Sequence, residues 1–580
     1  MRSTSLRYDR LRSPSVIAIL SGVRKAAERI PSAIRIEREP PWRMLSGMDW
    51  NEVARVSGYY GSVETSQSTL MLSIETLAAE LRAVVGDACV ITDPSELAAA
   101  SADLFPFPAP PPAALLVQPG STEQTAAVVK AAMRADFPVV ARGAGLSYTR
   151  GLATTSPAVV IDGARLNQID IHADDLFAVV GAGVSWQSLA EALAPHGLRS
   201  LLGGPISGAV TTVGGAASQY VPGSMEGVIG LKVVLADGSV ATTGSGARAG
   251  ALPFHRHAGP DLTGLFVGDC GAFGVKTELV LRLVRDQPAA FASFAYTDVT
   301  ALLADMLELR AASLATRAMA IDQSRGEAAG KVEAAEALRT VGAVVSASGS
   351  ALDAIRGVAS MVRGRAELAQ AQWSLHLTAE APTEEIARQM IALAKDRCMR
   401  SAREIEPTVP TALRARPYSI RGFVGIDGER WVPVHGMVAP SRAQAALNDL
   451  QALFDRYESE MTRVGVRHSY LMSAPGPFVT IEPMFFWVDA LDALHLKHLS
   501  ARNRERFAGR PPNHDARQLV ARLRAEVRDC FERHDAVHAQ AGRFYRHAER
   551  LDAGSRALLA RLKDSLDAEH RMNPGVLGLG

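Results

Sequence analysis

A glycine-rich segment with the chemistry of an anion-binding loop spans Ala141 to Tyr148 and reads Arg-Gly-Ala-Gly-Leu-Ser over residues 142–147. It directly follows the apolar run Phe137–Val140, which is typical of a short buried strand. Glycine lets backbone N–H groups approach a phosphate closely, and a serine hydroxyl adds a donor. The order is neither G-x-G-x-x-G nor a P-loop with its lysine, so taken alone this segment is more typical of a plain tight turn.

Two further glycine segments precede residue 276. Thr211–Gly215 follows Gly203-Gly204-Pro205, and Gly268–Val275 follows a short helix predicted over Asp261–Phe266. Three such segments in one domain of about 210 residues, an ordinary domain size, indicate an extended anionic ligand lying along the backbone. A dinucleotide, with a pyrophosphate at its centre, has that shape.

Imidazole and guanidinium groups gather near the C-terminus. His538 is the first candidate for a general base or anion ligand because imidazole titrates near neutral pH; a hydrogen-bonded structural histidine is the competing interpretation. Arg543 is a candidate anion clamp, since a guanidinium binds a carboxylate through two parallel hydrogen bonds. His435 is a further catalytic candidate in a predicted strand, where a satisfied core histidine is the simpler interpretation. Weaker candidates are His468, Ser469, Tyr470 and Glu482.

A predicted β-α-β unit positions the first glycine segment. Ala114–Gln118 is a predicted strand, and Ser121 followed by Gln124 is a capping box that begins a helix ending near Ala135. The next strand delivers the glycine segment. Further along, Asp237-Gly238 between two apolar runs predicts a hairpin, and Val275–Val284 alternates as a half-buried strand does.

Residues 288–520 alternate alanine-rich helical stretches with strands, which is typical of a separate α+β domain. Val341–Ala347 and Trp373–Leu377 are predicted strands. The charged stretch Ser500–Arg517 contains two adjacent prolines and predicts a surface loop. The last predicted helix, Ser555–Leu566, is expected to pack on the N-terminal domain through one leucine face: Leu558, Leu559, Leu562 and Leu566.

A chain of 580 residues exceeds one hydrophobic core, so several domains are expected. We predict a disordered leader over residues 1–70, because arginine is frequent there and no apolar period persists. An N-terminal domain over 71–287 and the α+β domain over 288–520 follow. Residues 521–580 form a C-terminal segment that is expected to return to the N-terminal domain.

Composition narrows the class of protein. The formal net charge of +1 argues against nucleic acid as the main partner. The four cysteines are far apart and have no metal, haem or disulfide spacing. No run approaches the roughly 18 apolar residues of a membrane span, and a cytoplasmic location is expected.

Four motifs, in order along the chain, resemble those of FAD oxidoreductases of the vanillyl-alcohol oxidase and p-cresol methylhydroxylase type. Residues 142–147 are similar to the first pyrophosphate loop of that family, residues 212–215 to the second, and residues 261–274 to the third. Residues 572–575, Met-Asn-Pro-Gly, resemble its closing turn. Four ordered motifs are more specific than any single one.

The resemblance implies an α+β fold: a two-subdomain PCMH-type FAD-binding domain, a cap domain with an antiparallel sheet, and C-terminal helices returning to the FAD domain. FAD is the implied cofactor. Leu146 stands near the place where some relatives attach FAD through histidine and cannot form that bond, and the histidine-rich metal motif of other relatives is missing, so no metal is expected. The residues implied to bind FAD are Arg142, Gly143, Ala144, Gly145, Leu146, Ser147, Pro205, Thr212, Val213, Gly214, Gly215, Asp261, Gly268, Gly271, Gly274, Val275 and Asn573.

The resemblance also implies a reaction, the oxidation of a small 2-hydroxy acid or alcohol by hydride transfer to flavin. Tyr545-Arg546 resembles a Tyr-Arg pair that holds a phenolate in phenol-oxidising relatives, although a surface ion pair is the simpler interpretation of Arg546. Two alternatives therefore stay open: a 4-alkylphenol or phenolic alcohol oxidase or dehydrogenase, and a non-catalytic flavin-binding subunit. Expected partners are a small-molecule substrate, a second copy in a homodimer, and an electron acceptor that the sequence leaves open among oxygen, quinone and cytochrome.

Overall fold

The computed structural model describes residues 60–580 except 202, 221–224, 331–341, 343–362, 419–423, 426 and 475, with side chains from residue 73 onward and without those of 327–330. The chain divides into two compact units, Met1–Leu72 and Ser73–Gly580, and the second is the subject below. The predicted leader and the predicted strand Val341–Ala347 lie almost entirely outside the described residues.

The first sheet of the N-terminal domain has the strand order β1-β2-β4-β3, with β2, β4 and β3 parallel and β1 antiparallel to β2. Its strands are β1 (Val90–Ile91), β2 (Leu115–Val117), β3 (Val139–Arg142) and β4 (Val159–Asp162). Helix α5 (Thr122–Arg134) connects β2 to β3. Ser121 caps it by accepting from the Gln124 backbone N–H at 3.2 Å, as predicted, but the Gln124 side chain accepts from Gly120 N–H at 2.7 Å rather than from Ser121.

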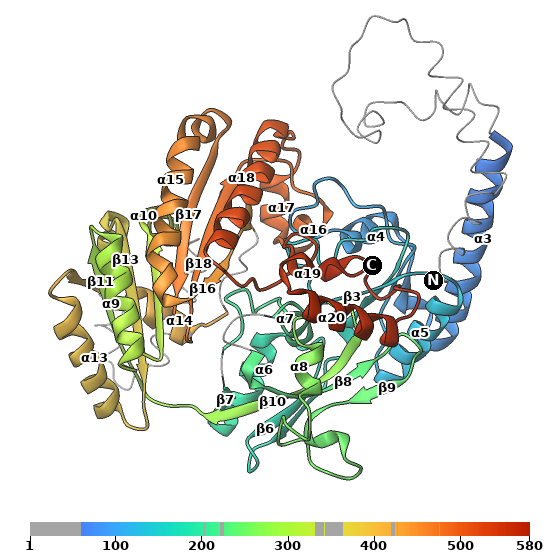
Figure 1. Ribbon diagram of the computed structural model, residues 1–580, viewed down its shortest axis with the longest axis horizontal. Coiled ribbons are helices and arrows are strands. Elements are labelled where there is room, and N and C mark those ends of the chain that lie inside the picture. The colour runs from blue at the N-terminus through green and yellow to red at the C-terminus, as the bar shows by residue number, and fades with distance from the viewer. Residues whose placement is uncertain are drawn as a thin grey trace, which may run out of the picture. The chain divides into compact units, whose positions relative to one another are not determined.

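The second sheet is antiparallel and has the order β5-β6-β10-β8-β9, with β7 pairing the end of β10. Its strands are β5 (Ile169–His172), β6 (Phe177–Gly181), β7 (Leu198–Ser200), β8 (Val228–Val234), β9 (Val240–Thr242) and β10 (Val275–Arg285). The predicted hairpin at Asp237-Gly238 joins β8 to β9, with Gly238 in the left-handed region at φ 81°. Helix α7 (Val213–Gln219) and helix α8 (Leu262–Phe266) lie beside this sheet and carry the second and third glycine segments (Figure 1).

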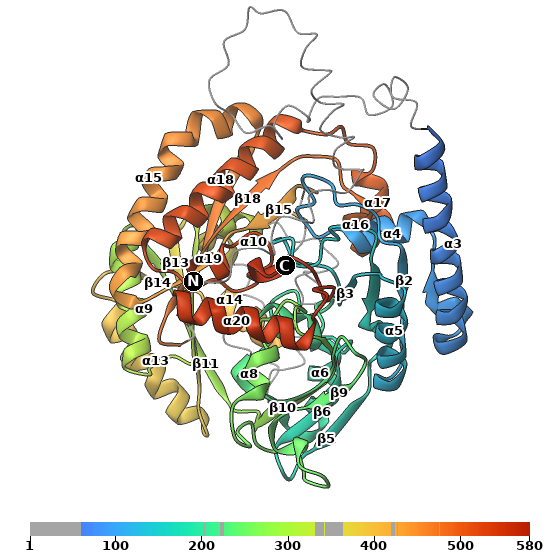
Figure 2. The ribbon, with the colours of Figure 1, turned by 45° about the vertical axis from the view of Figure 1, so that its right-hand side comes forward.

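The cap domain is built on a third, antiparallel sheet of order β14-β11-β13-β12-β17-β18-β15, with β16 pairing β18. Its strands are β11 (Ala289–Tyr296), β12 (Arg317–Asp322), β13 (Trp373–Glu380), β14 (Arg403–Ile405), β15 (Arg430–Pro433), β16 (Gly436–Val438), β17 (Val466–Ser473) and β18 (Val479–Trp487). One face is covered by α9 (Val299–Ala311), α13 (Glu384–Cys398), α15 (Pro440–Val464) and α18 (His514–Arg533) (Figures 1 and 2). Apolar side chains from this face and these helices form the largest core cluster.

Two predictions for the cap domain are wrong. Ser500–Arg517 is not a loop: it contains α17 (Ala501–Phe507) and the start of α18, and the two prolines stand between these helices. Ser500 and Asn513 cap them by accepting backbone N–H groups at 3.3 and 3.0 Å. His435 does not lie within a strand either, because it falls in the short break between β15 and β16.

The C-terminal segment returns to the N-terminal domain, as predicted (Figure 1). Met572 forms a parallel bridge with Val139 of β3, and the buried Lys563 of α20 (Ala553–Leu566) donates to the Ala272 carbonyl at 2.8 Å. Three of the four predicted leucines of α20 pack against the core of the second sheet, whereas Leu558 is 54% exposed and was wrongly assigned to that face.

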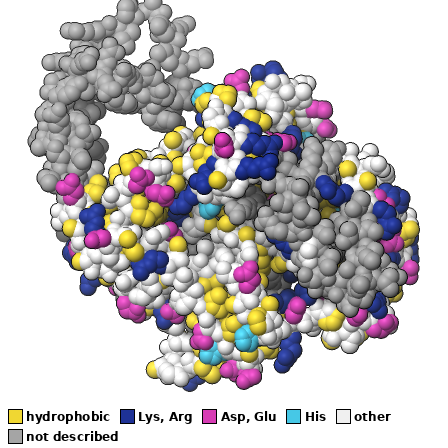
Figure 3. All heavy atoms as spheres, turned by 180° about the vertical axis from the view of Figure 1, so that it is seen from behind, with side chains coloured by type: hydrophobic (Ala, Val, Ile, Leu, Met, Phe, Trp, Pro, Cys, Tyr) yellow, Lys and Arg dark blue, Asp and Glu magenta, His cyan; other side chains and the backbone are white. Residues whose placement is uncertain are grey.

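The described helices include none that is long and apolar enough to cross a membrane. On the face seen in Figure 3, acidic and basic side chains are interspersed over the part that is described, in keeping with the net charge of +1.

Candidate active site

The first two glycine segments meet each other. A Cβ atom at Gly143 would lie 2.4 Å from Thr212 Oγ1, so only glycine permits this approach. Thr212 in turn caps α7 by accepting from the Gly215 N–H at 3.1 Å. The start of α7 therefore lies next to the first segment, although the N–H groups of Val213 and Gly214 already donate to the carbonyls of Val184 and Ala182 at 2.8 and 2.9 Å.

The Arg142 side chain packs against the first segment and links it to residues 100–102. Its buried guanidinium donates to the carbonyls of Ala100 and Ala102 at 2.9 and 2.8 Å. Burial lowers the pKa of Arg142 to about 10, and nearby carboxylates oppose that shift, so the side chain stays charged at neutral pH. Gly145 has φ 81°, and a Cβ there would lie 1.9 Å from Arg142 Nη2. The Arg142 guanidinium thus fills the space that a side chain at position 145 would need.

The third segment is bound to the end of α7. Gly268 N–H donates to the Ala217 carbonyl and Cys270 N–H to the Ser218 carbonyl, both at 2.8 Å. Inside this segment the buried Asp269 pairs with the buried Lys276 at 2.5 Å and accepts from Gly271 N–H at 2.9 Å. The ion pair fixes the turn that presents Gly271.

Asn573 of the C-terminal turn ties the third segment to Gly151, three residues beyond the first segment. Its side-chain amide donates to the carbonyls of Gly151 at 2.7 Å and Cys270 at 2.6 Å, and its oxygen accepts from Arg543 at 2.7 Å. All three glycine segments and the closing turn therefore converge on one region, as the sequence predicts.

Two features of this region fit an elongated polar ligand. The Gln219 Nε2 atom, at the end of α7, is buried and has no hydrogen-bond partner among the described atoms. A Cβ at Gly271, with φ 77°, would have no described neighbour closer than 3.9 Å. An unpaired buried donor beside an open backbone cradle is what a diphosphate ligand requires.

Several residues predicted to bind FAD also have an identifiable structural contact, and their part in FAD binding stays a prediction. Gly274 lets the chain pass close to β8, since a Cβ there would lie 2.5 Å from Val233 Cγ1. Gly214 does the same against Ala182 at 2.6 Å. Asp261 caps α8 and pairs with Arg256 at 2.9 Å. The remaining residues of this kind make contacts within the core or within a turn, and their part in FAD binding stays a prediction: Pro205, Val213 and Val275.

The cap covers the first segment. Ala144 accepts a 3.0 Å hydrogen bond from His498 of α16 (Ala493–His498). Leu146 packs against the core cluster of the cap, and Ser147 Oγ lies 3.3 Å from Thr149 Oγ1. The glycine segments thus lie where the N-terminal domain meets the cap.

Three of the predicted catalytic residues come together. The Tyr545 hydroxyl accepts a hydrogen bond from the backbone N–H of His435 at 3.1 Å. The Tyr545 ring stacks on the His538 ring, with centroids 3.9 Å apart. His538 Nδ1 lies 2.9 Å from the His435 carbonyl, which makes Nδ1 the donor and leaves Nε2 as an acceptor. Nε2 of both histidines is buried without a partner among the described residues.

Burial lowers the pKa of His435 and of His538 to about 4. Both imidazoles are therefore neutral at pH 7. A neutral imidazole with an unpaired Nε2 accepts a hydrogen bond well, but a pKa near 4 makes it a weak proton acceptor.

Tyr148 connects this cluster to the first glycine segment. Its ring contacts Trp431 and His435 edge-on, with centroids 5.7 and 5.9 Å apart. Its hydroxyl accepts from Gln540 at 3.0 Å, and its carbonyl accepts from the buried Arg524. Tyr148, at the end of the first glycine segment, and the cluster of His435, His538 and Tyr545 therefore form one site.

Glu482 completes the site, although the sequence ranks it only as a weak candidate. Burial raises the pKa of Glu482 to about 7, and Arg325 opposes the shift. Burial raises the pKa of the Tyr148 and Tyr545 hydroxyls, and the nearby Glu482 carboxylate adds to both shifts. A lone acid in the apolar run of β18 was the available signal, because a buried carboxylate in a strand needs a reason to be there.

Arg325 was not predicted at all. It follows β12 in α10 (Gln323–Gly330), and its guanidinium donates to Met484 Sδ at 3.2 Å. A thioether is a weak acceptor, so this cation beside Glu482 retains capacity for an anion. Nothing local in the sequence distinguishes it from the other arginines.

Two predicted anion-binding residues have other partners. Arg543 donates to the carbonyls of Arg150, Ala153 and Pro574 and to Asn573, so its donors hold the closing turn. Arg546 pairs with Asp529 and Glu532, as the simpler interpretation held.

The arginines whose charge acts on Tyr545 are Arg524 and Arg528, not Arg546. The predicted anion-binding roles of Arg543 and Arg546 are corrected accordingly.

Asp449, Cys530 and His534 form a separate group whose ligand atoms lie within 4.8 Å of one another. His534 Nε2 already lies within hydrogen-bond distance of an Asp449 carboxylate oxygen, at 2.8 Å, and burial raises the pKa of the Cys530 thiol to about 11. This group is explained as a contact between α15 and the residue that follows α18.

Comparison with known proteins agrees with this geometry. Residues 113–244 match the family model described as an FAD binding domain. The D-lactate dehydrogenase of Archaeoglobus fulgidus is 28% identical over 175 residues, which make up 29% of this chain and 38% of that protein. The mitochondrial cytochrome D-lactate dehydrogenase of Arabidopsis thaliana is 33% identical over 180 residues, 30% of each chain. The chain thus matches about a third of the length of these relatives.

A solved structure of p-cresol methylhydroxylase with substrate bound superposes with a TM-score of 0.65 and 17% identity, over 87% of this chain and 97% of that one. The chain therefore has the fold of the p-cresol methylhydroxylase type, which confirms the predicted fold class. Its residues 113–244 match the FAD binding domain model, and FAD is its cofactor.

Proposed function

We propose that this protein is an FAD-dependent oxidoreductase that oxidises a small 2-hydroxy acid at its CH–OH carbon. The observation that carries the proposal is the pair formed by Arg325 and Glu482 beside Tyr148, a cation and a carboxylate whose pKa lies near 7. A 2-hydroxy acid needs both groups, one for its carboxylate and one for its hydroxyl proton. The partial matches to two D-lactate dehydrogenases support the same substrate class.

In this proposal Arg325 binds the substrate carboxylate and Glu482 accepts the hydroxyl proton. A base is most effective when its pKa lies near the working pH, which favours Glu482 over the two histidines. His435 and His538 present Nε2 as acceptors that orient the substrate hydroxyl, and Tyr148 bounds the site on the side of the first glycine segment. FAD, when bound there, supplies the acceptor for the hydride.

An anaerobic substrate panel followed by flavin absorbance tests this proposal. D-lactate or glycolate is expected to bleach the flavin, and Glu482→Gln should slow bleaching about 10²- to 10⁴-fold. Arg325→Met should raise the KM for D-lactate more than that for a neutral alcohol, because only the former loses an ion pair. Arg546→Met is the matched control, since that arginine is paired elsewhere and is expected to leave both constants nearly unchanged. A flavin that no 2-hydroxy acid reduces would refute the proposal.

A phenol-oxidising activity is the second candidate, and Tyr148 with Tyr545 and Arg524 favours it. Two tyrosines beside a buried arginine are a fitting environment for a phenolate oxygen. Reduction by 4-ethylphenol but not by D-lactate, together with its loss in Tyr545→Phe, would select this candidate. A flavin that neither class reduces, with no effect of His538→Ala, would select the non-catalytic subunit.

We further propose that an electron acceptor drawn from oxygen, quinone or cytochrome regenerates the cofactor, and that the protein acts in the cytoplasm as a homodimer. Stopped-flow reoxidation with each acceptor tests the first point, sedimentation of the FAD-loaded protein tests the dimer, and cell fractionation tests the location.

A further inference from the structure

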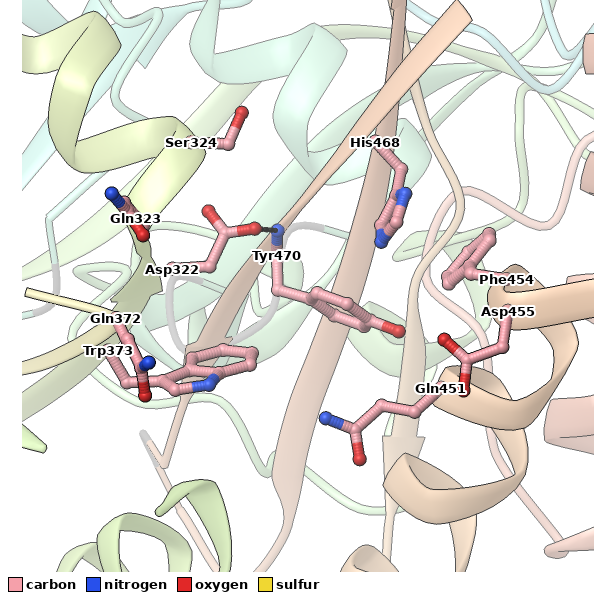
Figure 4. Close-up of a pocket in the computed structure, with 10 residues that line it drawn as sticks. All are labelled: Asp322, Gln323, Ser324, Gln372, Trp373, Gln451, Phe454, Asp455, His468 and Tyr470. Carbon is pink, nitrogen blue, oxygen red and sulfur yellow. Dashed lines mark hydrogen bonds between the residues drawn. The ribbon is translucent and has the colours of Figure 1, made fainter. Parts of the chain in front are cut away.

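A cavity of about 460 Å³ lies on the helix-covered side of the cap sheet. Its residues come from the end of β12, the start of α10, the start of β13 and the residue before it, β17 and α15 (Figure 4). Tyr470 pairs with Pro483, the neighbour of Glu482, so the strand alternation directs Tyr470 and Glu482 to opposite faces of the sheet. The volume falls within the range of small-molecule sites.

Aromatic rings form the walls of this cavity. Trp373 and Tyr470 have centroids 5.7 Å apart, and His468 stacks on Phe454 at 4.2 Å with planes 18° apart. His468 also meets Tyr470 edge-on at 5.7 Å. Burial lowers the pKa of His468 to about 4, so this ring is neutral at pH 7 and adds no positive charge.

The charged groups of the cavity are acidic. Asp322 and Asp455 are its ionisable carboxylates, and its ten lining residues include no lysine or arginine. Asp322 already accepts from Ser469 Oγ at 2.8 Å and from Tyr470 N–H at 3.0 Å. Asp455 has no hydrogen bond or ion pair with the described side chains, and Gln451, one turn earlier on α15, faces the same space (Figure 4).

A buried hydroxyl in the cavity lacks a partner among the described residues. Tyr470 is only 3% exposed, and its hydroxyl makes no hydrogen bond with the described residues. In Figure 4 that hydroxyl points to the side bounded by Gln451 and Asp455. A buried hydroxyl without a partner is costly, and a ligand with a polar group or a first-shell water at this place would satisfy it.

We propose that this cavity binds a small organic cation of the quaternary or methylated ammonium class. Ring faces attract such cations through the quadrupole of the π system, and aromatic cages with one nearby carboxylate suit them best. Trp373 and Tyr470 supply ring surface, and the exposed Asp455 supplies the unpaired charge. The inference does not rest on the proposed oxidation, because the two sites lie on opposite faces of the cap sheet.

Isothermal titration of the FAD-loaded full chain with tetramethylammonium tests the inference. tert-Butanol is the neutral probe of similar volume, and it has no hydrogen on its carbinol carbon, so the flavin cannot oxidise it. Tetramethylammonium is expected to bind at least about tenfold more tightly than tert-butanol. Flavin absorbance should stay unchanged throughout, which separates this result from any outcome at the oxidation site.

Two variants sharpen the test. Asp455→Asn should weaken tetramethylammonium binding at least about fivefold, and Trp373→Leu should weaken it at least about tenfold. Asp449→Asn removes the same charge from α15 but outside the cavity, where Asp449 pairs with His534, and should leave binding within about twofold. Equal binding of the charged and neutral probes, absence of binding by tetramethylammonium, or equal effects of Asp455→Asn and Asp449→Asn would overturn the inference.

Discussion

Replacing Gly145 by alanine tests whether the first glycine segment is built as the geometry indicates. At this position the backbone has φ 81°, and the added Cβ would lie 1.9 Å from Arg142 Nη2. The substitution therefore acts twice, once on the backbone conformation and once on the arginine that supports the segment.

The expected cost follows from these two contributions. A non-glycine residue in the left-handed region costs about 1–2 kcal/mol. Relief of the clash moves the Arg142 guanidinium and breaks at least one of its hydrogen bonds to the Ala100 and Ala102 carbonyls, which costs about 1.5–3 kcal/mol because the donor is charged. The free energy of unfolding of Gly145→Ala should fall by about 3–5 kcal/mol.

Gly250→Ala is the matched control. Gly250 has φ 72°, but its Cβ would have no described atom within 4 Å, so only the backbone contribution of about 1–2 kcal/mol applies. Urea unfolding at pH 7 gives both values, and titration of the apoprotein with FAD gives the affinities. We expect FAD binding to weaken at least about tenfold in Gly145→Ala and to stay unchanged in Gly250→Ala. Equal losses of stability in the two variants, with FAD affinity unaltered, would refute this account of the loop.

Three further variants test the supporting contacts. Lys276→Met leaves Asp269 buried without its cation and should lower the free energy of unfolding by about 3–5 kcal/mol in urea titration, with partial recovery when Asp269→Asn is added. Arg543→Lys replaces a fork of donors by a single ammonium and should cost about 2–4 kcal/mol, detectable as a lower melting temperature and earlier proteolysis at the C-terminus. Burial raises the pKa of Glu482 from 4.5 to about 7, so its charge destabilises the fold above pH 7 and this penalty disappears as the pH falls below about 4.5. Glu482→Gln should therefore raise the melting temperature at pH 8 and leave it unchanged near pH 4.5; a uniform shift at both pH values would contradict the raised pKa.

Features that depend on a few neighbouring residues were predictable from the sequence. Ser121 caps its helix at the expected place, since a cap needs only one side chain and the next backbone N–H groups. The glycine segments were recognisable for the same reason, because a close backbone approach or a positive φ admits little else. The wrong prediction of a loop over residues 500–517 shows the limit of local signals. The two prolines there separate two helices, and their presence alone does not distinguish a loop from a short break between helices.

The roles of the arginines could not be predicted, because tertiary contacts decide them. Arg543 lies next to the expected site in sequence, yet three backbone carbonyls and Asn573 take up its donors. Arg325 is more than 200 positions away from His538, yet the pairing of β12 with β17 and of β17 with β18 brings it beside Glu482. The same long-range pairing buries Glu482 and so raises its pKa. A sequence motif identifies where the cofactor binds, whereas the groups proposed to act on the substrate acquire their chemistry only from strand register and burial, and for that reason the substrate class has to be tested at Glu482 and Arg325.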